Sequence, residues 1–315
     1  MAGKESKLQS MRVLENFPAA VLADIQSVFE NGGALSHERC QSVMDALGIS
    51  AGVLMQRLLP LTGLYASAQI SGSQVGAVVN AAMSPDDSDV ALFLGANIEF
   101  PGQSLAQTIH AEQAAVVNAW LAGAGQIDSI AVTATPCGYC RQFLYELKNC
   151  RNLNILLCDQ RGGRTTRRRL TNLLPAAFGP HDLGHEGGLM GPPHPAIRLK
   201  LDGSAEDPVV FEALSAASKS YAPYSGNFAG CVIETTEGKM YAGRYAENAA
   251  FNPSVSPLQA AFIQMTMDTP GGQKKIRRAV LVEIPTAISQ RTICELHLNP
   301  IGPDVTLEYV EARVG

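Results

Sequence analysis

Two short segments of the chain hold side chains whose types and spacing suit a hydrolytic zinc site. The first reads TIHAEQ and contains His110 and Glu112, and the second reads TPCGYCR and contains Cys137 and Cys140. Imidazole nitrogen and thiolate sulfur are zinc ligands, and three of them leave the fourth tetrahedral position for a water molecule. We therefore expect His110, Cys137 and Cys140 to bind one Zn²⁺ per chain, with Glu112 as an unliganded carboxylate.

The spacing of His110 and Glu112 constrains where the metal lies. In the middle of a helix, two residues this far apart point about 200° away from each other. If both act at one metal, the metal must lie beyond a helix N-terminus, where first-turn side chains converge. Glu112 would then be a general acid/base that moves protons between the attacking water and the leaving group.

The second segment is expected to open a helix. Thr135 suits the N-cap and Pro136 the first helical position, which would place Cys137 and Cys140 in the first turn. The positive potential at a helix N-terminus favours thiolates there. Arg141 would either hydrogen-bond to sulfur or remain a surface residue.

A closed structural zinc site is the alternative. Such a site needs four protein ligands, and Cys150 or Cys158 would supply the fourth. That site gives no role to the H-x-E pattern. The seven cysteines, an odd number, favour thiols and metal ligands over a disulfide framework.

Composition is that of a soluble globular protein, with 46% hydrophobic and 17% charged residues and a net charge of −5. No apolar run approaches the roughly 18 residues of a membrane span, and residues 1–10 lack a signal-peptide core. We expect a cytoplasmic protein that contacts neither membrane nor nucleic acid, because its net charge is negative. One basic cluster is expected to be a solvated loop and helix face; it consists of Arg161, Arg164, Arg167, Arg168 and Arg169.

The length suits two domains, and the hydrophobic pattern predicts an α/β fold. Helical periodicity covers residues 12–58 and is closed by Pro60. Apolar segments 75–79 and 90–94 are expected to pair as a hairpin, followed by helix 108–122, strand 129–134, helix 136–148 and strand 153–158. The assigned units are a helical N-terminal segment (1–54), a catalytic domain (55–184), a linker (185–208) and a second domain (209–315).

The second domain repeats the pattern of the first. Residues 225–233 (SGNFAGCVI) echo residues 71–79 (SGSQVGAVV). Residues 241–247 (YAGRYAE) echo residues 93–99 (FLGANIE). A repeat of this length indicates duplication of a whole domain.

The chemical groups are missing from this second copy. If a one-residue deletion is allowed, Pro257 and Gln259 stand where the first copy has His110 and Glu112. The Pro285-Thr286 pair after the last apolar segment carries no C-x-x-C. We expect the second domain to be degenerate and to bind no zinc.

These motifs resemble those of cytidine deaminases, specifically the long two-domain type of bacteria and plants, over almost the whole chain. The motifs are TIHAEQ, TPCGYCRQF, GANIEF from Gly95, LPAAFGP from Leu174 and YAENAAFNP from Tyr245. The resemblance implies two duplicated three-layer α/β/α domains, each with a mixed central sheet. It also implies zinc-dependent hydrolytic deamination of cytidine and 2′-deoxycytidine, with Glu112 protonating ring N3 and the departing ammonia.

The resemblance also assigns substrate contacts. Asn97 and Glu99 would hydrogen-bond to the ribose 3′-hydroxyl, which an amide and a carboxylate can do with donor and acceptor atoms. Backbone groups of Ala111 and Cys137 would contact the pyrimidine. Phe178 would stack on the base or form a wall beside it.

The family builds each active site at a dimer interface. Ala249, Ala250 and Phe251 of the degenerate domain would therefore close the pocket of the partner in a homodimer. The chain departs from the usual family pattern at Ser73, where a phenylalanine normally lines the base pocket. A serine cannot stack on a base, so this position puts substrate affinity or breadth in question.

Two alternatives remain open at this point. A nucleotide or polynucleotide deaminase would need a phosphate-binding group or basic and aromatic surfaces, and a carboxylate beside the sugar disfavours a phosphate. A non-catalytic zinc-binding scaffold would release no ammonia. It would also tolerate replacement of Glu112.

Overall fold

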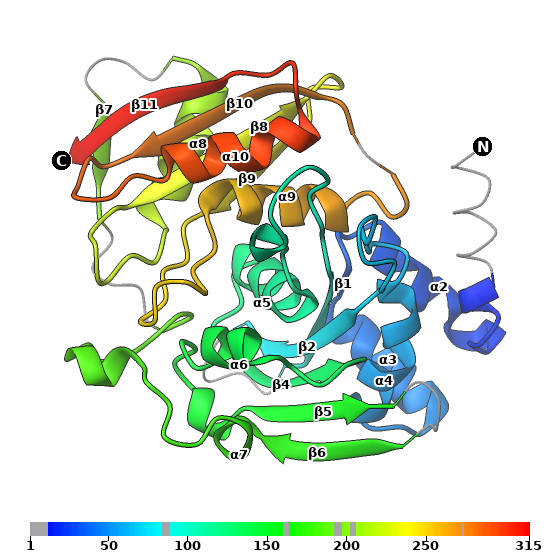
Figure 1. The fold of residues 1–315 in the computed structure, drawn as a ribbon. Coiled ribbons are helices and arrows are strands. Elements are labelled where there is room, and N and C mark those ends of the chain that lie inside the picture. The colour runs from blue at the N-terminus through cyan, green and yellow to red at the C-terminus, as the bar shows by residue number, and fades with distance from the viewer. Residues whose placement is uncertain (1–11, 84–88, 160–163, 192–196, 202–205, 273) are drawn as a thin grey trace.

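The computed structural model shows two lobes, each built around one β-sheet (Figure 1). It describes residues 12–83, 89–159, 164–191, 197–201, 206–272 and 274–315. Strands and helices interleave in both lobes, and each sheet combines parallel and antiparallel neighbours. The expected α/β fold with two similar lobes is therefore confirmed.

The first sheet has the strand order β1-β3-β2-β4-β5-β6. Its strands are β1 (Ala34–Leu35), β2 (Gly76–Ala82), β3 (Ala91–Ala96), β4 (Gln126–Val132), β5 (Asn154–Cys158) and β6 (Thr165–Arg169). β2 and β3 form the predicted hairpin, and only β4 and β5 run parallel among these neighbours. The carboxyl ends of β3 and β4 lead toward the segments with the chemical motifs.

The N-terminal helices pack on this sheet. They are η1 (Ala19–Val21), α2 (Leu22–Gln26), η2 (Ser27–Phe29), α3 (His37–Leu47) and α4 (Ala51–Thr62). α4 crosses the expected domain boundary at residue 54, and Pro60 lies inside it instead of closing it. The flanking Leu59 and Leu61 are buried, which holds the last turn despite the missing N–H of the proline.

Among the described residues, no single helix is long and apolar enough to cross a membrane. Taken together, α3 and α4 meet the length and composition criteria for a membrane span, but the two helices are bent by 105° at the break between them. Half of the residues of α4 are buried within the lobe, namely Leu54, Met55, Leu58, Leu59, Leu61 and Thr62.

α4 and α5 (Ala111–Leu121) cover opposite faces of the first sheet. Gly76 lies against Thr62 of α4, while Gly95 lies against the backbone of α5. Gly95 pairs with Ala77, the neighbour of Gly76, so the two glycines point to opposite faces. A Cβ on Gly95 would lie 2.1 Å from the amide nitrogen of Ala115, so only glycine lets α5 approach this closely. The lobe thus has the expected three layers.

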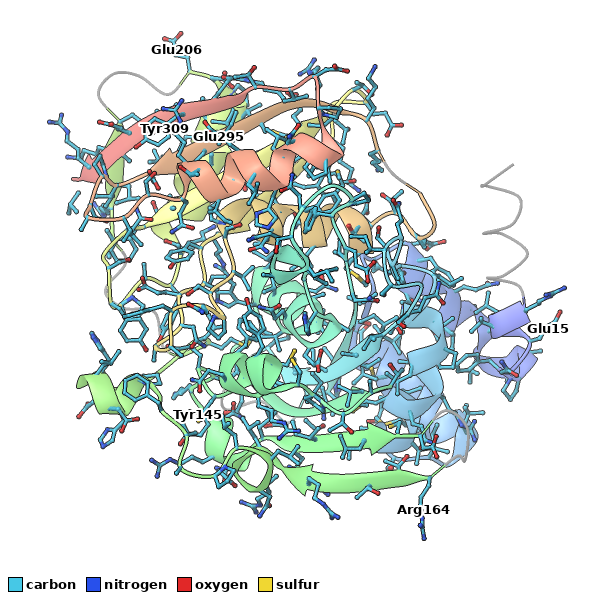
Figure 2. The ribbon with its side chains drawn as sticks, viewed as in Figure 1. Glu15, Tyr145, Arg164, Glu206, Glu295 and Tyr309 are labelled. Atoms are coloured by element: carbon cyan, nitrogen blue, oxygen red, sulfur yellow. The ribbon has the colours of Figure 1, made fainter. Side chains whose placement is uncertain are left out.

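Three members of the basic cluster, Arg167, Arg168 and Arg169, lie on the edge strand β6 and not on a helix face, and Arg164 directly precedes this strand. Arg167 and Arg169 donate to Asn154 and Asn152 of the neighbouring segment. Arg164 projects from the end of this edge into solvent (Figure 2). Arg161 lies outside the described residues. Charged side chains on an exposed edge strand discourage pairing with another chain, which explains the composition of β6.

The second sheet has the order β7-β11-β10-β8-β9. Its strands are β7 (Leu199–Leu201), β8 (Ala229–Thr235), β9 (Met240–Arg244), β10 (Ile276–Glu283) and β11 (Leu307–Val314), and its helices are α8 (Pro208–Ser218), α9 (Pro257–Met267) and α10 (Arg291–Ile301). β10 and β11 are parallel, like β4 and β5 of the first sheet. The expected linker therefore contains a strand, β7, which pairs with β11 at the sheet edge.

The two lobes pack through α5 and α9, which lie between the sheets (Figure 1). Every residue of α5 from Ala111 to Trp120 is buried, so this helix is covered on all sides. At the same contact the Arg244 guanidinium lies 3.9 Å from the Trp120 ring centroid and donates to the Trp120 carbonyl oxygen. One continuous hydrophobic core therefore spans both lobes.

The close approach at Gly95 generates a stability prediction. Gly95→Ala should lower the free energy of unfolding by about 1–3 kcal/mol, because the added Cβ forces α5 away from the sheet. Gly52→Ala is the matched control. A Cβ there makes an ordinary 3.5 Å contact with Leu156, so the substitution should be neutral or stabilising. Urea denaturation of both variants measures the difference, and equal stability would contradict the packing described here.

Candidate metal centre and active site

The three expected ligands come together at the starts of two helices. His110 is the N-cap residue of α5, and Cys137 is the N-cap residue of α6 (Gly138–Leu144). Cys140 is the third residue of α6 and is buried. Thr135 and Pro136 precede the cap, so the expectation that they begin the helix is wrong. The Cys137 sulfur accepts from the Cys140 backbone N–H, and this takes the capping role that was assigned to Thr135.

The geometry of the ligand atoms fits a tetrahedral zinc ion. The sulfur atoms of Cys137 and Cys140 are 3.7 Å apart, and they lie 3.6 and 3.2 Å from Nδ1 of His110. Typical zinc–ligand bond lengths at tetrahedral angles give about 3.8 Å between two sulfurs and about 3.6 Å between sulfur and nitrogen. Within the described residues, these three side chains form the one group of potential metal ligands close enough together to bind an ion. Both the donor set and its spacing thus suit zinc.

The cysteines outside this cluster do not complete a four-ligand site. Cys158 lies on β5, where its thiol bonds to the Leu156 carbonyl and to Thr165. Cys150 begins a short 3-10 helix (Cys150–Asn152). Neither belongs to the cluster of His110, Cys137 and Cys140. The arrangement therefore favours an open centre with a fourth position for water.

The thiols interact strongly with each other. The hydrogen bond with Cys140 is the main cause that lowers the pKa of Cys137 to about 5. The same hydrogen bond and burial raise the pKa of Cys140. A cation at this point would favour the thiolate form of both residues.

Arg141 does not approach the sulfur atoms. Its Nε donates to the Pro136 carbonyl at 2.8 Å, and Nη1 donates to the Leu173 carbonyl at 2.7 Å. The possibility of a bond from Arg141 to sulfur is therefore wrong. The side chain instead ties the start of α6 to α7 (Leu170–Leu173).

Glu112 is the second residue of α5 and lies beside the ligand cluster. Its side chain is buried, and burial raises the pKa of the carboxyl. The interaction with the Cys140 thiol and the positive charge of His110 act in the opposite direction and lower this pKa. Because His110 is outside the helix and Glu112 is in its first turn, both reach the same point beyond the helix start. This matches the argument from the two-residue spacing.

Asn97 and Glu99 hold the loop that precedes β2. The Asn97 side chain accepts from Val75 N at 2.9 Å and donates to the Ser73 carbonyl at 2.9 Å. The Glu99 carboxylate accepts from the Ser71 hydroxyl at 2.5 Å and from the amides of Ile70 and Ser71. Burial opposes ionisation, but these hydrogen bonds prevail and lower the pKa of Glu99. A ribose contact of this pair stays a prediction.

The remaining expected contacts lie in three places. Ala111 is fully buried at the start of α5, beside Glu112. Phe178 is 45% exposed, and its carbonyl accepts from the Gln142 side chain. Phe251 is 66% exposed and has a φ of 62°, whereas its neighbour Ala250 is half-buried. Within one chain, Phe178 and Phe251 therefore lack a cover.

An open pocket of about 610 Å³ borders the centre between the lobes. Its lining includes His110 and Tyr139 from the first lobe, and Tyr245 and Ser254 from the second. Glu112 does not line it.

The second lobe preserves the framework of the centre without its ligands. Gly243 lies against Pro257 and Ala261 of α9, just as Gly95 lies against Ala111 and Ala115 of α5. This match aligns Ser256 with His110 and Leu258 with Glu112. The proposed equivalence of Pro257 and Gln259 to those residues was wrong by one position. The lengths of the preceding loops differ, and a linear comparison of the sequence cannot locate that difference.

Gln259 corresponds instead to Gln113. Each glutamine accepts from the backbone N–H of its own helix cap, at 3.0 Å from Ser256 and 3.2 Å from His110. Likewise Glu247 accepts from the amides of Tyr224 and Ser225, as Glu99 does from Ile70 and Ser71. Serine and leucine at the two catalytic positions supply neither a zinc-binding nitrogen nor a proton carrier.

Three residues near the centre escaped the sequence analysis. Gln113 and Tyr139 lie within the quoted motifs, and both donate to backbone carbonyls of the second lobe. Glu146 is buried after α6 and contacts residues 75 to 103 positions away. Its partners are too distant in sequence for any spacing rule to find. The one signal in the sequence is a charged residue within an apolar stretch.

Comparison with known proteins agrees with this geometry. Residues 54–156 and 170–295 match two family models, each described as the cytidine and deoxycytidylate deaminase zinc-binding region. A cytidine deaminase of Aliivibrio fischeri is 38% identical over 298 residues, which cover 94% of this chain and 95% of that protein. A cytidine deaminase of Photorhabdus laumondii is 41% identical over 269 residues, which cover 85% and 86%. The chain therefore belongs to the cytidine and deoxycytidylate deaminase family, with one zinc-binding region that keeps its ligands and a second that has lost them.

Proposed function

We propose that the protein catalyses the hydrolytic deamination of cytidine and 2′-deoxycytidine to uridine and 2′-deoxyuridine, with release of ammonia. The observation that carries this proposal is the open triangle of His110, Cys137 and Cys140 with the buried Glu112 beside it. The cytidine deaminases that resemble the chain over most of its length support the substrate. We place the reaction in cytoplasmic pyrimidine nucleoside salvage.

His110, Cys137 and Cys140 would hold the zinc ion. When bound, zinc lowers the pKa of a water molecule in its fourth position toward neutrality. Glu112 accepts the proton of the attacking water and passes it to ring N3 of the pyrimidine. After the oxygen of that water has added to C4, Glu112 takes the second proton from the new hydroxyl group and delivers it to the amino group, which leaves as ammonia. A carboxyl group whose pKa is raised by burial suits this exchange, because it can hold the proton between the two transfers.

Asn97 and Glu99 would bind the ribose 3′-hydroxyl, while backbone groups of Ala111 and Cys137 contact the pyrimidine. The two side chains now bond to residues 70–75, so substrate would share or replace hydrogen bonds of this loop. Ser73 carries no ring, and Phe178 would supply the aromatic surface beside the base.

The active site would be completed in a homodimer. Ala250 and Phe251 of the partner would close the pocket, and the large exposed area of Phe251 in this single chain supports that role. We assign the catalytic role to the first lobe and a supporting role to the second. We include α4 in the catalytic unit because it packs on the first sheet, and β7 in the second unit because it pairs with β11.

The two other functions have weaker support. A phosphorylated substrate would place a negative group near Glu99, whose low pKa keeps it charged. The basic residues lie on the edge strand β6. Asn97 and Glu99 follow β3, and three strands separate β3 from β6 in the sheet, so the basic residues are not beside the proposed sugar site. A zinc scaffold needs no buried carboxylate beside the metal.

Glu112→Gln tests the proton-transfer role. The amide keeps the shape of the side chain but cannot carry a proton, so kcat for cytidine should fall by about 10²–10⁴-fold. Zinc content should remain one per chain, measured by atomic emission on the same sample. Full activity with zinc bound would rule out Glu112 as the acid/base.

Zinc stoichiometry tests the division between the lobes. The wild-type protein should hold one zinc per chain, and Cys137→Ser should reduce this number because it removes a thiolate ligand. Ser256→Ala at the equivalent cap of α9 is the matched control and should leave zinc content unchanged. Two zinc ions per chain in the wild type would contradict a degenerate second lobe.

The proposed ribose contacts of Asn97 and Glu99 generate a prediction about substrate preference. Cytidine and deoxycytidine should be turned over with kcat/KM at least about tenfold above that of CMP, a difference of about 1.4 kcal/mol. Glu99→Gln should lower kcat/KM for cytidine and narrow the gap to CMP, because the charge is lost. Steady-state rates of ammonia release measure both, and a preference for CMP would favour the nucleotide alternative.

A further inference from the structure

One loop of the second lobe is anchored by the first lobe of its own chain. This anchored loop comprises residues 248–253, which follow β9 and contain Ala250 and Phe251. Four hydrogen bonds join it to α5 and α6 or the residues after α6: Gln113 Nε2 to Pro253 O (3.2 Å), Tyr139 OH to Asn252 O (2.8 Å), Asn248 Nδ2 to Gln142 O (3.2 Å) and Ala249 N to Glu146 Oε2 (2.8 Å). The helices that present the zinc ligands therefore also hold this loop.

Glu146 is the charged member of this set. Its side chain is 1% exposed, and burial raises the pKa of the carboxyl. Oε1 accepts from the hydroxyls of Tyr221 at 2.7 Å and Tyr224 at 2.6 Å, while Oε2 accepts from the amide of Ala249. Within the described part of the chain, no ion pair involves Glu146, so these three donors are what compensates its burial.

All three donors belong to the second lobe, whereas Glu146 belongs to the first. The two tyrosines lie before β8 in the turn that Glu247 also holds through Tyr224 N. One carboxylate thus fixes two separate segments of the second lobe against α6. Neither the zinc ligands nor Glu112 require this contact, so the chemistry at the metal does not explain it.

Hydrogen bonds within the anchored loop connect Asn248 to residues 250–252. Ala250 N donates to Asn248 Oδ1 at 2.9 Å, Phe251 N donates to Asn248 O, and Asn252 N donates to Ala250 O. Phe251 adopts a φ of 62°, which is strained for a residue with a side chain. Such a conformation persists only when its surroundings fix it; on one side Ala249, two residues before Phe251, is held by Glu146, and on the other Asn252 is held by Tyr139.

We propose that Glu146 is a positioning residue for the active site of the partner subunit. It acts through Ala249 on Ala250 and Phe251, which close the pocket of the other chain under the proposed function. The chemistry at the metal of its own chain does not depend on it. Glu146 is thus expected to influence the binding of nucleoside more than the rate of proton transfer.

Two substitutions test this role in the zinc-loaded, full-length dimer. Glu146→Ala removes all three acceptor contacts and should raise KM for cytidine about tenfold, with kcat changed less than about threefold. Glu146→Gln retains an acceptor for Ala249 N, and its amide can donate to the tyrosine hydroxyls, so KM should return most of the way to the wild-type value. Zinc content should stay at one per chain in both. A fall in kcat with unchanged KM would overturn the proposal.

Mixed dimers then show in which chain Glu146 acts. A Glu146→Ala chain is paired with a Glu112→Gln chain, and the heterodimer is isolated through two different affinity tags. Its one competent metal centre belongs to the Glu146→Ala chain, while the loop over that centre comes from the chain with intact Glu146. KM should therefore return to the wild-type value at about half the wild-type kcat per dimer. A KM that stays raised places the effect within one chain and overturns the proposal.

A parallel heterodimer of Phe251→Ala with Glu112→Gln separates this inference from the proposed function. If KM of this pair is restored but that of the Glu146→Ala pair is not, the pocket is shared and only the role of Glu146 is wrong. If neither is restored, the shared pocket is wrong and the role of Glu146 falls with it. Wild-type protein that releases no ammonia from cytidine would reject the proposed function directly.

Two further variants guard against trivial effects. Glu295→Gln changes a half-exposed carboxylate that pairs with Arg291 on α10 (Figure 2), and it should leave KM and kcat unchanged. If Glu146→Ala does not fold, Tyr224→Phe takes its place, because it removes a single hydroxyl and keeps the ring. Its KM should rise about threefold and be restored in the mixed dimer. An unchanged KM in Tyr224→Phe, together with failed folding of Glu146→Ala, would reduce Glu146 to a stability residue and overturn the proposal.

Discussion

The first turn of α5 carries two functional side chains two positions apart, and a regular helix points such residues in nearly opposite directions. The chain resolves this conflict by starting the helix directly after His110. This residue keeps an extended conformation as the N-cap. That start is fixed by Gln113, whose side chain accepts from His110 N, and by Gly95, which lets the backbone of α5 touch the sheet. Moving the helix start by one residue would separate His110 from Glu112, so the position of α5 determines whether a centre exists.

The burial of α5 makes the second lobe part of this constraint. α9 covers the face of α5 that the first sheet leaves open, and Arg244 stacks on Trp120 at the same contact. The second lobe has kept what this support requires, namely the glycine at the helix contact, the glutamine at the helix cap and the buried glutamate after β9. It has Ser256 and Leu258 at the positions of His110 and Glu112, so a zinc ligand and the acid/base group are missing. Framework and reactivity are therefore separable in this fold.

The sequence was sufficient for the ligand set, the β2–β3 hairpin, the mixed sheets and the duplication, because each depends on local spacing or on a repeated pattern. It was insufficient where distant segments decide the outcome. The start of α6 was placed two residues early because Thr135 and Pro136 suit a helix start by themselves, whereas the Cys137 sulfur takes the cap. The strand β7 was hidden in a Gly/Pro-rich stretch because it is short and depends on β11 for pairing. Glu146 has partners that only the folded chain brings near.

The packing of α5 on α9 within one polypeptide has an evolutionary consequence. Two identical chains that met through the same pair of helices would be related by symmetry, and every substitution would appear on both sides of the contact. Here the two sides are encoded separately, so Ser256 and Leu258 can replace a ligand and an acid without removing His110 and Glu112. Because the two sides of this contact are separate in the sequence, one half is free to serve as a support.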